Sequence, residues 1–202
     1  MRGFTLVELL ISVAIMAILS AVALPNFSAW LANSQIRSVS EALQNDLRLA
    51  QSEAVKRNRI VALVLTNSTP TTASPGSTAA TPARNWVIYA LPLQNSDEGA
   101  ASAAGSTRMV KAFTQENNSR TQVSLAARVV CFNSMGRLVT QTTGIADAGN
   151  VQCAAPAANA PLAFAIQNPS GNTNLSVQLT LGGQVRMCNP SKSISTSPDG
   201  CT

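Results

Sequence analysis

Hydrophobic positions divide the chain into an unbroken apolar run, a periodic segment and a series of short runs. The first run, residues 4–24, reads FTLVELLISVAIMAILSAVAL, and Glu8 is its only charged residue. A helix of this length rises about 31 Å, which matches the hydrocarbon core of a bilayer. Residues 4–27 are therefore predicted to form a hydrophobic helix in a membrane or in the core of an assembly, with Trp30 as an interfacial anchor.

Helical periodicity continues beyond Pro25. Apolar residues recur there at intervals of three and four, the spacing of one helix face: Ile36, Val39, Leu43, Leu47, Ala50 and Ala54. The opposite face is charged and spaced for i,i+4 ion pairs: Arg37 with Glu41 and Glu53 with Arg57. Because a proline inside a helix removes a hydrogen bond and bends the axis, Pro25 is predicted to kink one helix that spans residues 4–57. A simple helix boundary at Pro25 is the alternative.

After residue 58 the pattern changes to short apolar or alternating runs, which predict strands. They are residues 60–66, 86–91, 109–113, 123–132, 137–140, 162–167, 175–181 and 184–188. Gly182-Gly183 predicts a two-residue hairpin between the last two runs, and residues 67–85 and 94–107 have the composition of surface loops. The predicted fold class is α+β, with a long kinked N-terminal helix packed on an antiparallel β-sheet or sandwich head.

Composition favours an extracellular or envelope protein and argues against an enzyme. Charged residues make up 11% of the chain, the net charge is +5, and the 14 basic residues form no long run. The chain has no histidine, the commonest general base and a frequent metal ligand, and no two acidic residues have a spacing that identifies an acid/base pair. We therefore predict no catalytic residue, no metal site and no cofactor.

The four cysteines, Cys131, Cys153, Cys188 and Cys201, lie in the C-terminal part of the chain and contain no C-x-x-C pair. Export into an oxidising compartment favours two disulfides over free thiols. Three connectivities are open. Loop length favours Cys131 with Cys153 and Cys188 with Cys201, each contributing roughly 3 kcal/mol by restricting the unfolded chain.

The order of residues at the N-terminus argues against an ordinary secretory signal. Such a signal has a shorter apolar core with its cleavage site behind it, whereas here Arg2 and Gly3 precede the apolar run. A carboxylate in lipid costs roughly 2.5–3.5 kcal/mol, so Glu8 requires a compensating partner and indicates function.

Residues 3–11, GFTLVELLI, resemble the G-F-T-L-x-E-L-x-x motif of type IV prepilins and type II secretion pseudopilins. The resemblance implies cleavage between Gly3 and Phe4 by a prepilin peptidase, N-methylation of Phe4, and pairing of Glu8 with the N-terminal amine of a neighbouring subunit. The leader, residues 1–3, is shorter than many in the family, so either a minimal leader suffices or translation starts upstream.

The resemblance also implies a division of the chain and a location. Residues 1–3 form the leader, 4–27 the hydrophobic helix, 28–58 the amphipathic half of the helix, and 59–202 a β-rich head with disulfides. The chain is expected in the bacterial inner membrane as a single-pass protein with its head in the periplasm, and after assembly in an extracellular pilus.

Three further segments are similar to the GspH/FimT/FimU group of this superfamily. Residues 35–59 are similar to the group's helix pattern A-x-x-L-x-x-x-L-x-x-A-R-x-E-A-x-x-R, and residues 131–137 to its pattern F-x-x-x-G-R. Residues 183–190 are similar to its closing strand, which contains a cysteine. In the first segment the matching positions are Ala42, Leu43, Leu47, Ala50, Ser52, Glu53, Ala54 and Arg57. Membership implies a non-enzymatic minor pilin of the FimU type, located near the pilus tip, which primes assembly and links other minor pilins to the major pilin.

Three alternatives remain open at this point. A FimT-like pilin would bind DNA through a G-R-x-R motif, but here the sequence is Gly183-Gln184-Val185-Arg186, which leaves Arg186 and Lys192 as candidate phosphate contacts. A GspH-type pseudopilin of type II secretion would share every N-terminal feature. An adhesin would use the Thr/Ser-rich loops, in which nothing identifies a ligand.

Overall fold

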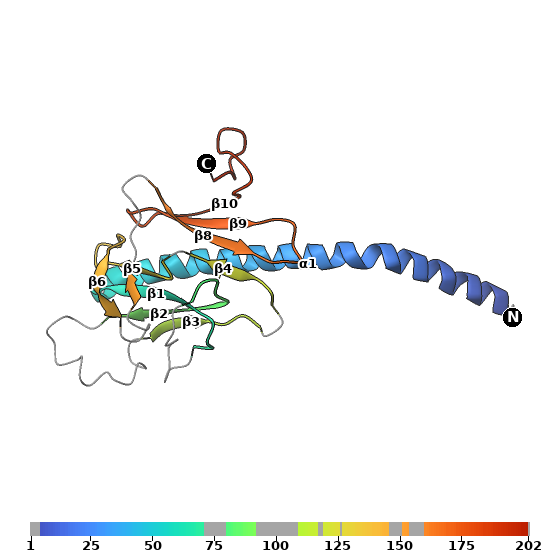
Figure 1. Ribbon diagram of the computed structural model, residues 1–202, viewed down its shortest axis with the longest axis horizontal. Coiled ribbons are helices and arrows are strands. Elements are labelled where there is room, and N and C mark those ends of the chain that lie inside the picture. The colour runs from blue at the N-terminus through green and yellow to red at the C-terminus, as the bar shows by residue number, and fades with distance from the viewer. Residues whose placement is uncertain are drawn as a thin grey trace.

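The computed structural model describes residues 5–70, 80–91, 109–116, 119–125, 127–145, 151–153 and 160–201, with the backbone alone for residues 22–26, 141–145, 151 and 152. Its elements are α1 (Leu6–Arg57), β1 (Val61–Thr66), β2 (Asn85–Ala90), β3 (Met109–Phe113), β4 (Gln122–Ser124), β5 (Val129–Phe132), β6 (Gln141–Ile145), β7 (Val151–Cys153), β8 (Leu162–Gln167), β9 (Leu175–Leu179) and β10 (Val185–Cys188). The C-terminal half of α1 lies within a β-rich head, and its N-terminal half projects away from the head (Figure 1). The predicted α+β fold is confirmed.

Both ends of α1 are capped by signals that the sequence carries. The Thr5 hydroxyl accepts a hydrogen bond from the Glu8 amide at 3.3 Å, and Glu8 lies in the first turn, where the helix dipole favours an acid. At the other end Asn58 adopts the left-handed conformation, with φ at 50°, directly after the basic Lys56 and Arg57. The long predicted helix is therefore confirmed between Leu6 and Arg57.

The helix continues through Pro25. Because α1 is one element from residue 6 to residue 57, the alternative of a helix boundary at Pro25 is excluded. In Figure 1 the N-terminal half of the ribbon curves away from the line of the C-terminal half. The Pro25 side chain lies outside the described residues, so a kink caused by Pro25 stays a prediction.

The predicted membrane span is only partly covered by the described residues. Within them, the structure contains no helix with both the length and the apolar character needed to cross a bilayer. The predicted span, residues 4–27, includes residue 4 and the side chains of residues 22–26, which lie outside the described part.

The strands form three antiparallel sheets around the C-terminal half of α1. The strand orders are β3-β2-β1-β5, β10-β9-β8-β4 and β6-β7. In Figure 1, α1 passes between the two four-stranded sheets. The predicted apolar face of the helix is buried against them and forms one core with Trp86, Phe132 and Phe164: Ile36, Val39, Leu43, Leu47, Ala50 and Ala54. Burial of this stripe holds the head on the helix.

The prediction of one strand over residues 123–132 is wrong. The segment forms β4 in one sheet and β5 in the other. Between them Arg128 has a φ of 64°, a left-handed conformation that ends an extended strand. Val123 of β4 and all four residues of β5 are buried, and mostly apolar residues stand between them, so the sequence shows no break there.

The strand predicted over residues 137–140 is also wrong, and two strands were missed. Leu138 makes only an isolated bridge to Phe132, and the next strands are β6 and β7. The sequence of β6, QTTGI, contains a glycine and a single large apolar residue, so it carries little of the pattern that predicts a strand.

The hairpin between β9 and β10 is confirmed, but its turn is longer than predicted. The Gly183 amide donates to the Thr180 carbonyl at 2.9 Å, and the Thr180 amide donates to the Gln184 carbonyl at 3.0 Å. Gly183 has a φ of 86°, as in a three-residue hairpin loop with a glycine in the left-handed position. A Cβ at Gly183 would lie 2.2 Å from the Gly136 carbonyl oxygen and 2.3 Å from Gln51 Nε2.

Gly183→Ala is therefore expected to lower the free energy of unfolding by about 1–3 kcal/mol, because it combines left-handed strain with a backbone clash. Gly182→Ala is the matched control, since a Cβ there would meet only Thr180 Oγ1, at 3.9 Å. Urea unfolding of the two variants measures the difference. Equal stability of the two variants would show that the contact between the hairpin and the Gly136 turn is not needed.

Candidate functional site

The projecting half of α1 leaves a large apolar surface uncovered. Every described side chain from Leu6 to Ala21 is exposed, whereas Ala32 is the first buried residue of the helix. The large hydrophobic residues on this half are between 53% and 76% exposed: Leu6, Val7, Leu9, Leu10, Ile11, Val13, Ile15, Met16, Ile18 and Leu19. Apolar patches of this extent on a soluble protein mark contacts with protein or membrane. The projecting half is therefore an interaction surface.

Glu8 lies near the free end of this surface. Its backbone is held in the first turns of α1, where its amide donates to Thr5 and its carbonyl accepts from the Ser12 hydroxyl at 2.7 Å. No described residue donates a hydrogen bond to its carboxylate or forms an ion pair with it, and the side chain is exposed. Gly3 and Phe4, the predicted processing residues, lie outside the described part of the chain. The structure thus presents a carboxylate on an uncovered apolar helix.

Where α1 enters the head, a turn before β9 docks on the helix. The Asn33 side-chain oxygen accepts hydrogen bonds from the amides of Asn172 and Thr173 at 3.1 and 3.3 Å and from the Thr173 hydroxyl at 2.8 Å. Gly171 permits this approach, because a Cβ there would lie 2.9 Å from Ile36 Cδ1. Phe27 and Trp30, with ring centroids 5.8 Å apart, remain mostly exposed just outside this junction.

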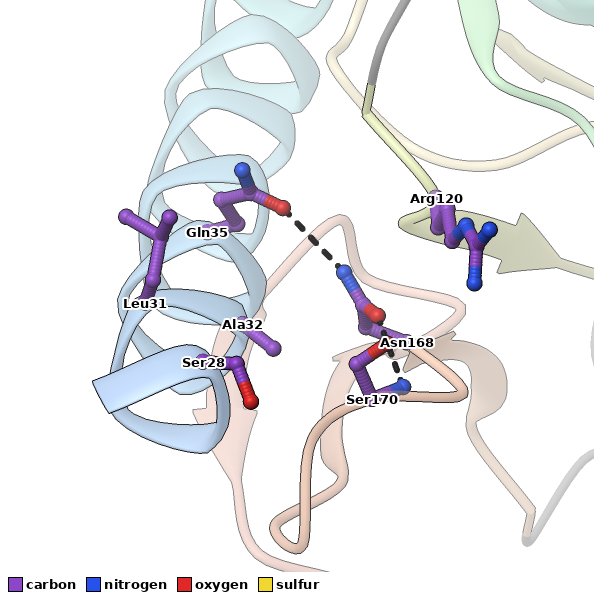
Figure 2. Close-up of a pocket in the computed structure, with 7 residues that line it drawn as sticks. All are labelled: Ser28, Leu31, Ala32, Gln35, Arg120, Asn168 and Ser170. Carbon is purple, nitrogen blue, oxygen red and sulfur yellow. Dashed lines mark hydrogen bonds between the residues drawn. The ribbon is translucent and has the colours of Figure 1, made fainter. Parts of the chain in front are cut away.

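A pocket of about 190 Å³ opens at the same junction, between α1 and the residue 168–170 turn. Its lining comes from three distant segments, drawn in Figure 2: Ser28, Leu31, Ala32, Gln35, Arg120, Asn168 and Ser170. The Asn168 amide donates to Gln35 at 3.2 Å and to the Thr121 hydroxyl at 3.0 Å, and its oxygen accepts from the Ser170 amide at 3.0 Å. These bonds fix the turn against the helix. Arg120 is exposed, and no described residue accepts a hydrogen bond from its guanidinium.

Asp46 is a buried carboxylate that the sequence analysis did not single out. It is 1% exposed and accepts hydrogen bonds from Trp86 Nε1 at 2.8 Å and from Lys111 Nζ at 2.6 Å. Trp86 stacks on Phe113 with ring centroids 3.9 Å apart. Asp46 therefore ties α1 to β2 and β3. The signal in the sequence was its position three residues after Leu43 and four before Ala50, beside the apolar face.

The two disulfides have the pairing that loop length favours. Cys131 of β5 is joined to Cys153 of β7, with Cα atoms 5.6 Å apart, and Cys188 of β10 to Cys201, with Cα atoms 5.0 Å apart. The first bond ties the small β6-β7 sheet to the main body. The second closes a C-terminal loop over residues 189–200, which extends from β10 on the side away from α1 (Figure 1).

Arg186 and Lys192, the candidate DNA contacts, are both engaged within this C-terminal loop. The Arg186 guanidinium donates to the carbonyl oxygens of Pro198 and Gly200 at 3.0 and 2.7 Å. Lys192 pairs with Asp199 at 2.7 Å, and this hydrogen bond holds the pKa of Asp199 below its usual value. The structure thus gives the two cations an intramolecular role, and we do not propose DNA binding.

Arg186→Met is expected to loosen the C-terminal loop while the disulfide keeps it closed. Losing two charge-assisted hydrogen bonds should raise amide exchange over residues 189–201 and speed tryptic cleavage after Lys192 several-fold. Arg137→Met is the matched control, because Arg137 is exposed and its side chain has no described partner. Unchanged cleavage in Arg186→Met would show that the disulfide alone orders the loop.

Two family models match this chain, one over its N-terminal segment and one over the rest. The family model of the type II transport protein GspH matches residues 39–200, and the model of the prokaryotic N-terminal methylation motif matches residues 1–24. The structure is similar to the type IV minor pilin FimU of Pseudomonas aeruginosa, with 15% identity over 79% of this chain and 92% of that chain and a TM-score of 0.49. It is also similar to the minor pseudopilin EpsH from the type 2 secretion system of Vibrio cholerae. That match has 12% identity, covers 77% of this chain and 98% of EpsH, and has a TM-score of 0.44.

Proposed function

We propose that this chain, which belongs to the GspH family of type IV pilin-like subunits, is a minor pilin of the FimU type, built into a type IV pilus at or near its tip. The family consists of structural pilins and pseudopilins and not of enzymes. In this role the chain helps prime pilus assembly and links the other minor pilins to the major pilin. Its chemistry is packing between subunits.

The observation that carries the proposal is the uncovered N-terminal half of α1. The head buries the helix from Ala32 onward, but it leaves residues 6–21 without protein cover. A soluble monomer rarely exposes such a continuous apolar surface. Covering that surface with protein or lipid removes apolar area from water and is therefore favourable. Helices of neighbouring subunits provide the cover in a filament, and lipid provides it before assembly.

Processing and location follow from the same end of the chain. The match of residues 1–24 to the methylation motif supports processing of this chain by prepilin peptidase, which we propose cleaves after Gly3 and methylates Phe4. The new amine of one subunit then pairs with Glu8 of a neighbour, which compensates the carboxylate once the apolar helix is covered. Before assembly the chain is anchored in the inner membrane by residues 4–27, with its head in the periplasm.

The position near the tip is tested by deleting the gene for this chain and labelling the protein in filaments. A minor pilin that primes assembly leaves few or no pili when it is deleted, and a label on the head appears at filament ends. Loss of protein secretion with normal piliation would instead assign the chain to a type II secretion pseudopilus. Label distributed along the whole filament would show that the chain is not restricted to the tip.

A further inference from the structure

We infer that the pocket lined by Ser28, Arg120 and Ser170 binds the phosphate of an anionic phospholipid headgroup while the chain is anchored in the membrane. The inference rests on the proposed membrane stage of the chain and adds a specific lipid contact to it. The pocket has no assigned role in subunit packing or processing.

The first support is the depth of the pocket relative to the predicted span. That span ends at Phe27, and the helical lining of the pocket begins at the next residue, Ser28, and ends at Gln35. These eight positions rise about 12 Å along the axis. The headgroup region of a bilayer adds roughly 5–7 Å on each side of the hydrocarbon core. The helical wall of the pocket therefore begins within the headgroup layer.

The aromatic side chains beside the pocket agree with this depth. Phe27 and Trp30 are 61% and 64% exposed, and they lie at the end of the apolar segment. Tryptophan is enriched at membrane interfaces, where its ring lies at the level of the headgroups. The described apolar and interfacial residues of α1 thus place Ser28 next to lipid phosphates.

The second support is the chemistry of the lining. Arg120 contributes a guanidinium without a described acceptor, and Ser170 contributes a hydroxyl on the turn that Asn168 holds in place. Leu31 and Ala32 form an apolar wall suited to the glycerol and upper acyl carbons. A guanidinium group binds phosphate through two parallel hydrogen bonds, and Arg120 is the one charged residue among the seven that line the pocket.

The absence of acidic residues from the described lining favours an anionic lipid over a zwitterionic one. Phosphatidylethanolamine carries an ammonium group that needs an acceptor, and none of the seven residues around the pocket has a carboxylate.

A second pocket, on the other flank of the helix, does not offer an uncompensated cation to a phosphate. Its cation, Arg37, is paired with Glu41 at 3.0 Å, so its charge is already compensated. Phosphatidylglycerol at the Arg120 pocket is the occupant that the charges select.

The test is lipid retention by the full chain. The chain is reconstituted into vesicles of phosphatidylethanolamine with a minor fraction of phosphatidylglycerol, extracted in mild detergent, and analysed by native mass spectrometry. We expect phosphatidylglycerol to be retained in preference to phosphatidylethanolamine, and Arg120→Gln to reduce that preference about tenfold. Arg48→Gln removes the same charge from an exposed position on α1, outside the pocket, and should retain the preference.

Each outcome decides for or against the inference. Equal retention of phosphatidylglycerol by the Arg120→Gln and Arg48→Gln variants would overturn it, as would displacement of the lipid by inorganic phosphate at millimolar concentration. Failure of the wild-type chain to enter vesicles would instead count against the proposed membrane stage, and absence from pili against the minor-pilin role. Lipid selectivity and filament assembly are therefore tested separately.

Discussion

Replacing Glu8 with alanine is expected to reduce the amount of this chain in filaments by about tenfold or more, while the head keeps its fold. In the proposed filament, apolar side chains of neighbouring subunits would cover the projecting half of α1, and a charge pair there would act through a low dielectric. A tenfold loss corresponds to about 1.4 kcal/mol, less than a well-placed pair in such surroundings provides. The head is unaffected because Glu8 lies far along the helix from Ala32, where burial begins.

The measurement is the ratio of this chain in sheared filaments to its level in whole cells. Glu41→Ala is the matched control, since Glu41 is an exposed carboxylate on the same helix and, among the described residues, its ion pair is with Arg37 at the surface. It should enter filaments normally. Glu8→Gln, which keeps the shape and removes the charge, should behave as Glu8→Ala does. Normal incorporation of both Glu8 variants would show that the charge of Glu8 does not set the register between subunits.

Replacing Asp46 with alanine is expected to lower the free energy of unfolding of the head by about 2–4 kcal/mol. The change leaves the buried Trp86 Nε1 without its acceptor at 2.8 Å, and this unpaired donor accounts for most of the cost. Lys111 loses less, because its side chain is 47% exposed and its ammonium can return to water. Asp46→Asn should lie between the variant and the wild type, since its oxygen can still accept from the indole.

Urea unfolding of a soluble head that begins at Ser28 measures this effect. We expect that fragment to fold alone, because the buried residues of α1 begin at Ala32. Asn45→Ala is the control, an exposed change at the neighbouring position that should alter stability by less than about 0.5 kcal/mol. An Asp46→Ala head as stable as the Asn45→Ala head would contradict the role given to the carboxylate.

The helix was predictable because each of its features is local in sequence. The spacing of Ile36 to Ala54 set the buried face, Thr5 and Asn58 capped the ends, and helical periodicity beyond Pro25 indicated that the helix continues. The strands were less predictable, since Val123 of β4 and the four buried residues of β5 belong to one mostly apolar stretch of sequence. What divides them is the left-handed Arg128, which neither composition nor periodicity indicates.

The functional surface was partly predictable for the same reason. Glu8 is visible as the one charge in an apolar run, and the structure leaves the described side chains of that run, residues 6–21, uncovered. The Arg120 pocket was not predictable, because residues 28–35, 120 and 168–170 meet only in the folded chain. The cysteines left three connectivities open. The structure resolves them through the positions of β5, β7 and β10.

The most direct test of the minor-pilin assignment is mass spectrometry of purified sheared pili for the N-terminal peptide of this chain. We expect a peptide that begins at N-methylated Phe4, present at a small fraction of the amount of the major pilin. Filaments that lack the chain, together with a membrane fraction in which the chain still begins before Phe4, would contradict the minor-pilin assignment.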